Sequence, residues 1–169
     1  MSRSQRPTVD IDTFHSMASE MYDQIPERLL DGLNGGIVIS EEARQDDEEE
    51  LPDVYILGEY IEDPYLGNSI VLYYGSFVAL FRDEPVEVWE DELWETMVHE
   101  VRHHIEHRAG VYDLDLEDLR QLEEFRRQAR EEREAGREAV GKPGSPPPKK
   151  ARKRKPRKHP WRDKPGRRR

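Results

Sequence analysis

Residues 88–110 read VWEDELWETMVHEVRHHIEHRAG, and this stretch decides how the chain folds. Its apolar residues recur every three or four positions, which predicts an amphipathic helix over residues 88–109 that Gly110 ends as a C-cap. At 100° per residue, His99 and His103 lie on a face nearly opposite to the apolar one. The apolar, core-facing positions are Trp94, Val98, Val101 and Ile105.

The same helix carries His99-Glu100-Val101-Arg102-His103, an HExxH pattern. Residues i and i+4 lie on one helix face, so their two imidazoles can bind a single metal ion. The glutamate beside the first histidine can then reach a metal-bound water and accept its proton. The chain contains no cysteine, so any metal must be held by His, Asp and Glu. The pattern predicts one Zn²⁺ per chain, and a merely charged helix face is the alternative.

A catalytic zinc ion usually has three protein ligands and a water. Asp113, three residues after Gly110, is our candidate for the third ligand, and capping of the last helix is its structural alternative. Glu106 shares the histidine face but lies about 10 Å along the axis from His99. We therefore expect Glu106 to orient an imidazole from outside the coordination sphere, although it remains the rival ligand. Further candidates for such an outer role, or for an alternative ligand, are His104 and His107.

The segments around this helix predict a small α+β domain. An amphipathic helix is expected to begin near Asp10 and end near Ile25, with a short helix over residues 26–33. Residues 77–81 fit either a strand or a helical turn, and residues 41–53, dominated by acids, are expected to be a solvated loop. A last helix is predicted over residues 116–137, with its charged second half as a solvated extension. The three predicted strands are residues 36–40, 54–60 and 69–74.

Charge is distributed unevenly along the chain. The net charge is −10, yet residues 142–169 carry 14 Lys and Arg against one acid, Asp163. The remainder keeps 13 of 27 basic residues and 36 of 37 acidic ones, a balance of −23. We therefore predict a loose leader at residues 1–9, one folded domain at residues 10–138 and a disordered basic tail at residues 139–169.

Several classes of protein do not fit this composition. The absence of cysteine excludes a disulfide framework, a Cys-rich zinc finger and an iron–sulfur cluster. No apolar run approaches the roughly 18 residues of a membrane span. No apolar segment follows the two basic residues near Met1, so no secretory signal is expected. We expect a cytoplasmic protein without a membrane partner.

These motifs resemble those of the small bacterial zincin-like metallopeptidases, a minimal zincin family with a short HExxHH helix. The resemblance covers roughly residues 11–119. It rests on the doubled His103-His104 and on Leu57-Gly58-Glu59-Tyr60, which is similar to the family's Leu-Gly-x-Tyr signature. It implies a minimal zincin-like fold, in which a small, mostly antiparallel three-stranded sheet packs on the HExxH helix between N- and C-terminal helices.

The chain departs from the family pattern after the second motif histidine. In the family's short form, a glycine follows that histidine by three residues and an aspartate comes three later. Here Glu106 occupies the glycine position, and the Gly-x-x-Asp step comes one helical turn later, from Gly110 to Asp113. The departure concerns the third ligand and leaves the HExxH helix unchanged.

The motif and the resemblance together predict a zinc metallopeptidase. Glu100 would be its general base, with metal-activated water as the nucleophile and a peptide or protein as the substrate. The strand at residues 69–74 is our candidate for pairing with an extended peptide. Oxyanion donors are expected among Arg102, His104 and Tyr112.

Two alternatives come from other classes. The first is a non-catalytic zincin-like protein that binds the ion without hydrolysing peptides, since the small domain leaves little room for a cleft. The second is a nucleic-acid-associated protein that acts through residues 142–169, where Lys, Arg and Trp161 suit phosphates and stacked bases. The same tail could also bind an acidic partner. Neither the oligomeric state nor the physiological metal follows from the sequence, because His and carboxylate ligands also accept Mn, Co and Ni.

Overall fold

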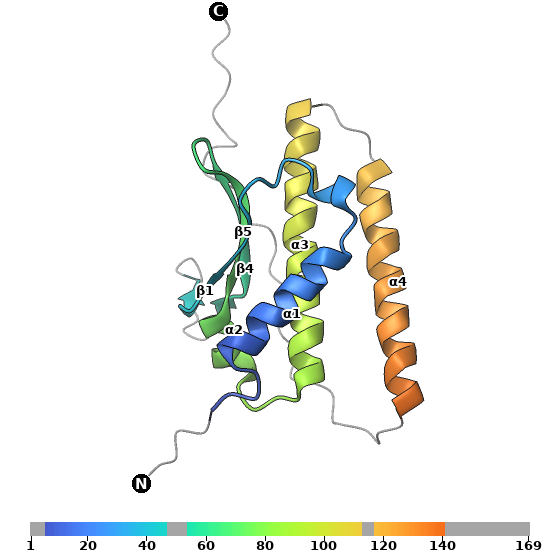
Figure 1. Ribbon diagram of the computed structural model, residues 1–169. Helices are drawn as coiled ribbons and strands as arrows, with labels where there is room; N and C mark the ends of the chain where they lie inside the picture. Colours follow the sequence, from blue (N-terminus) through green and yellow to red (C-terminus); the bar gives the residue numbers. More distant parts are fainter. Residues whose placement is uncertain (1–5, 47–53, 113–116, 141–169) are drawn as a thin grey trace, which may run out of the picture.

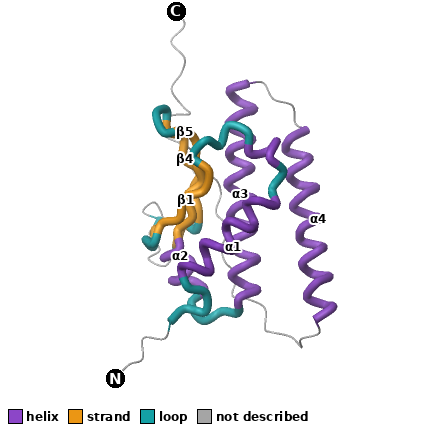
Figure 2. The backbone as a smooth tube through the Cα atoms, viewed as in Figure 1, coloured by secondary structure: helices purple, strands orange, loops and turns teal. Residues whose placement is uncertain are grey.

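The computed structural model describes residues 6–46, 54–112 and 117–140. A sheet lies on one side of the long central helix α3, and α4 runs along another side of it (Figure 1). Figure 2 shows the same separation between strands and helices. The helices are α1 (Ile11–Gln24), the 3-10 helix η1 (Glu27–Leu30), α2 (Tyr74–Phe81), α3 (Val86–Tyr112) and α4 (Glu117–Val140). The strands are β1 (Gly36–Ser40), β2 (Arg44–Gln45), β3 (Tyr55–Ile56), β4 (Gly58–Asp63) and β5 (Gly67–Tyr73).

The main sheet has the strand order β1-β5-β4, with β5 in the centre. Strands β4 and β5 form an antiparallel hairpin, in which Tyr60 lies opposite Ile70. Strand β1 pairs with the other side of β5 in parallel, with Val38 opposite Val71. The sheet is therefore mixed, and the prediction of a mostly antiparallel sheet was wrong for the β1–β5 pair. The long connection between β1 and β5 allows the crossover that a parallel pair requires.

Two predicted elements have different boundaries in the structure: the strand over residues 54–60 and the helix that ends near Gly110. The strand predicted over residues 54–60 is interrupted at Leu57, because β3 pairs with β2 whereas β4 pairs with β5. The carbonyl of Leu57 accepts a hydrogen bond from the amide of Tyr73 at 2.9 Å. Gly110 does not end α3, which continues to Tyr112, and Gly110 is not among the glycines with positive φ. The prediction of a C-cap at Gly110 was therefore wrong.

Other segments settle ambiguous or incomplete predictions. Residues 77–81 belong to helix α2, and the short helix predicted over residues 26–33 is one turn of 3-10 helix. The acidic loop predicted over residues 41–53 contains the two-residue strand β2 and the buried Asp46. Its residues 47–53, the leader up to residue 5 and the tail from residue 141 lie outside the described residues.

The core lies between α1, the inner face of the sheet and α3. The apolar face predicted for α3 is confirmed, because Trp94, Val98, Val101 and Ile105 are at most 3% exposed. Burial of such side chains away from water is the main favourable contribution to folding. It also fixes the rotation of α3 about its axis, and thereby the direction in which the HExxH residues point. None of the described helices is long and apolar enough to cross a membrane.

Helix α4 packs against α3 through apolar side chains, such as Leu122 and Phe125, and through arginine side chains. The guanidinium of Arg133 lies 4.5 Å from the centre of the Trp94 ring. Arg137 donates to both carboxylate oxygens of Asp91, at 2.7 and 3.0 Å. Most residues in the second half of α4 are exposed, as their charge predicted, but Arg133 and Arg137 also attach this half to α3. The sequence pattern missed these contacts because arginine can cover apolar surface with its side-chain carbons while its head group stays polar.

Candidate metal centre

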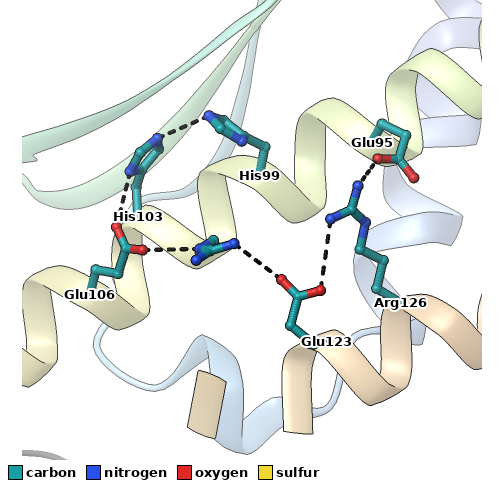
Figure 3. Close-up of polar contacts among 7 residues, drawn as sticks. Glu95, His99, His103, Glu106, Glu123 and Arg126 are labelled. Atoms are coloured by element: carbon teal, nitrogen blue, oxygen red, sulfur yellow. Dashed lines mark hydrogen bonds and ion pairs between the residues drawn. The ribbon is translucent and has the colours of Figure 1, made fainter. Parts of the chain in front are cut away.

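His99 and His103 converge on one side of α3. Their Nε2 atoms are 3.0 Å apart, and their rings are 4.6 Å apart at 88° to one another (Figure 3). Two nitrogens bound at 2.0–2.1 Å to one tetrahedral zinc ion lie about 3.3 Å apart, so the observed pair needs little movement to share an ion. His99 is exposed, and the His103 side chain is 23% exposed, which leaves the pair accessible. These two donors therefore fit a zinc ion.

Glu100, the carboxylate between the two histidines in sequence, lies inside the protein. It is 7% exposed, and its Oε2 accepts a hydrogen bond from the backbone amide of Tyr60 at 3.0 Å. Burial raises the pKa of Glu100 to about 7, the amide of Tyr60 opposes this rise, and the nearby Glu59 adds to it. A carboxyl group with such a pKa can accept and release a proton near neutral pH.

Close approach of β4 to α3 makes this hydrogen bond possible. A Cβ atom on Gly58 would lie 2.6 Å from Cγ2 of Thr96 and 3.4 Å from Cγ of Glu100. Only glycine leaves room for α3 at that distance, and the backbone amide of Tyr60, two residues later, then reaches the motif glutamate. The Leu-Gly-x-Tyr segment thus has a physical reason to accompany HExxH, which the sequence alone did not disclose.

His104 has a different role from its neighbour. It is fully buried, with Nε2 2.8 Å from the carbonyl oxygen of Asp31 and Nδ1 3.1 Å from the hydroxyl of Tyr60. The carbonyl can only accept, so Nε2 carries the proton and Nδ1 accepts from the Tyr60 hydroxyl. Burial lowers the pKa of His104 and raises that of Tyr60, which favours both neutral forms. His104 therefore joins α3 to β4 and to the turn after η1.

Glu106 and His107 lie further along the same helix. Glu106 Oε2 is 3.5 Å from Nδ1 of His103, on the opposite side of the ring from the Nε2 that faces His99. His107 Nδ1 is 2.7 Å from Oε1 of Glu62 on β4. Among the residues that the structure places, the Glu106 contact is the arrangement expected of a carboxylate that orients a metal-binding imidazole. The functional assignments of Glu106 and His107 stay predictions.

The third metal ligand is not settled by the described part of the chain. Within residues 6–46, 54–112 and 117–140, no three His, Asp or Glu side chains form a complete metal-binding group. Asp113, our candidate, lies outside these residues. Because α3 continues to Tyr112, its helical axis carries the chain about 13 Å beyond His103. A ligand at Asp113 therefore requires the last turns of α3 to unwind, because the step from Tyr112 to Asp113 spans only about 3.8 Å.

A helix with two histidines four residues apart, a buried glutamate between them and an adjacent sheet defines the zincin class of site. The comparisons with known proteins agree: a model of the family described as zincin-like metallopeptidase matches residues 8–124. This chain belongs to that family.

One solved structure gives a second comparison. The conserved hypothetical protein (TTHA0227) from Thermo thermophilus is 34% identical to this chain, with a TM-score of 0.53. The match covers 60% of this chain and 98% of that chain. The similarity therefore extends to both sequence and fold. No match was found among curated proteins.

Proposed function

We propose that the protein is a zinc-dependent metallopeptidase. The observation that carries this proposal is the position of Glu100, which is buried and bonded to Tyr60 while its neighbours His99 and His103 converge at an accessible point. Membership of the zincin-like metallopeptidase family supports it. A charged helix face without function would not need a buried carboxylate, because burying a charge is costly unless it is compensated.

In this proposal, His99, His103 and Asp113 hold one zinc ion per chain. The ion, when bound, supplies a Lewis acid that polarises the scissile carbonyl and lowers the pKa of water. Glu100 accepts a proton on a carboxylate oxygen and returns it to the leaving amine. Tyr60 holds that carboxylate through its backbone amide, so the base is oriented before a substrate binds.

A substrate peptide is expected along β4. The prediction that residues 69–74 pair with an extended peptide was wrong, because β5 is the central strand with neighbours on both sides. Strand β4 is an edge of the three-stranded sheet, and its residue Tyr60 directs its amide toward Glu100 rather than toward β5. We propose that an extended peptide adds to this edge, beside the motif helix, through backbone groups of β4 other than the Tyr60 amide, which Glu100 occupies.

Metal content is the first measurement that tests the proposal. We expect about one zinc ion per wild-type chain by elemental analysis and none in a His99→Ala/His103→Ala double variant. Glu100→Gln should keep the zinc ion and abolish hydrolysis of an unstructured protein substrate such as casein. Equal, negligible zinc in both proteins after refolding with zinc would refute the metal site.

The non-catalytic alternative gives a different result in the same experiment. Zinc bound to the wild type, absent from the double variant and accompanied by no hydrolysis that Glu100→Gln removes would favour a metal-binding protein. The cytoplasmic location remains a proposal, as does binding of nucleic acid or an acidic partner through residues 142–169. Nucleic-acid binding by residues 1–140 alone would contradict the tail as its site.

A further inference from the structure

A continuous chain of charged side chains leads from His103 to helix α4 and back to α3. Figure 3 draws this chain of contacts across the two helices. It begins with Nδ1 of His103, 3.5 Å from Oε2 of Glu106. The other oxygen of Glu106, Oε1, accepts from Nε of Arg102 at 3.0 Å. Both carboxylate oxygens of Glu106 are therefore engaged, one by the imidazole and one by the guanidinium.

Helix α4 holds the far side of Arg102. The Nη1 atom of Arg102 donates to Oε1 of Glu123 at 3.2 Å. The second oxygen of Glu123 lies 3.8 Å from Nη1 of Arg126. Arg126 also donates to Glu95, which lies one turn before His99 on α3. From Glu106 to Glu95, acidic and basic side chains alternate, so each of these links is an ion pair.

We propose that α4 is a positioning element of the metal centre, in which Arg126 holds Glu123, Glu123 holds Arg102, and Arg102 holds Glu106 against His103. This inference rests on the proposed zinc site. Partners outside the coordination sphere fix the ring orientation of a metal-binding histidine and affect metal affinity. Arg126 contacts Glu123, and Glu123 contacts Arg102, so the influence of α4 passes through Arg102 and Glu106. The family match ends at residue 124, and Arg126 lies beyond it.

Because the side chains of Arg102, Glu106 and Glu123 are at least partly exposed, we expect them to affect the zinc affinity rather than the stability of the fold. The side chains of Arg102, Glu106 and Glu123 are 48%, 36% and 51% exposed. Exposed ion pairs contribute little to stability, so substitutions here should leave the fold intact. Substitutions of Arg102 or Glu123 free the Glu106 carboxylate to turn away from His103. The zinc affinity should therefore decrease.

The experiment is a titration of the full-length apoprotein with zinc in competition with a chromogenic chelator. We expect Glu106→Ala to weaken zinc binding by roughly 10- to 100-fold, the range for loss of a partner outside the coordination sphere. Arg102→Ala and Glu123→Gln should weaken it by a smaller factor, roughly three- to tenfold. Glu131→Gln is the matched control, because Glu131 pairs within α4 with Arg127 and its side chain is 61% exposed.

A double-mutant cycle separates positioning from general damage to the fold. In the Glu106→Ala background, Glu123→Gln should have no further effect on zinc affinity, because Glu123 acts through Glu106. Equal affinities of wild type, Arg102→Ala and Glu123→Gln would overturn the inference, as would a Glu123→Gln effect that persists undiminished without Glu106. Wild-type protein that binds no zinc would instead refute the proposed function itself.

Discussion

The backbone amide of Tyr60 lies 3.0 Å from Oε2 of Glu100, so the edge strand of the sheet holds the carboxylate of the HExxH motif. The two residues are 40 positions apart in sequence. This contact requires β4 to lie close to α3. Substitutions that push the two elements apart should therefore break it.

Gly58→Ala should push β4 away from α3. The new methyl group would lie 2.6 Å from Cγ2 of Thr96, closer than side-chain atoms can approach. We expect a loss of about 1–3 kcal/mol in the free energy of unfolding, typical of overpacking in a core, together with reduced hydrolysis. Urea unfolding measures the first quantity and a peptidase assay the second.

Thr96→Ser provides the matched rescue for this variant. Serine lacks Cγ2 but keeps the hydroxyl that bonds to the carbonyl of Glu92. The double variant Gly58→Ala/Thr96→Ser should therefore recover most of the lost stability. If it is no more stable than Gly58→Ala, contact with Thr96 is not the cause of the loss.

Tyr60→Phe should destabilise the fold but keep the zinc ion. The variant removes the hydroxyl that donates to Nδ1 of His104, and the buried nitrogen loses its partner. An unpaired buried acceptor costs about 1–3 kcal/mol, whereas the amide that holds Glu100 remains. Thermal unfolding and zinc content measure the two effects. Tyr65→Phe is the control, because Tyr65 is 94% exposed, and a similar loss there would contradict the explanation.

Arg133→Ala should loosen α4 from α3. The guanidinium lies over the Trp94 ring, and loss of such a cation–π contact costs on the order of 1 kcal/mol. Arg127→Ala removes an equally long side chain that pairs only along the exposed surface of α4, and should change stability much less. Chemical unfolding of both variants compares them, and equal losses would show that the Trp94 contact contributes nothing of its own.

Asp10 should make stability depend on acidity at low pH. Hydrogen bonds from Thr13 lower the pKa of Asp10 in the folded protein below its ordinary value of 3.8, so its stabilising contribution is fully present above that ordinary value. The contribution is lost as the pH falls through the lower, folded-state pKa. Asp10→Asn keeps an N-cap acceptor but does not titrate. Its melting temperature should fall less steeply than that of wild type between about pH 5 and pH 2, and parallel curves would exclude Asp10 as a source.

Local patterns in the sequence predicted the half of the site that lies on one helix. The rotation of α3 followed from its apolar positions, and the spacing of His99 and His103 placed both rings on one side. The contact between Arg102 and Glu123 spans 21 residues and depends on the docking of α4 against α3, whose register the sequence does not specify. The break at Leu57 was also hidden, because the apolar run continues through it.

The adjacent residues His103 and His104 should give inactive variants for two different reasons. Adjacent helical residues point about 100° apart, so His103 faces His99 at the proposed zinc site while His104 faces the protein interior. In a screen for inactive variants, changes at the two positions would look alike. Lysates should separate them, because cells carrying a His103 variant would accumulate intact protein, whereas a His104 variant would be depleted by proteolysis of its unfolded chains.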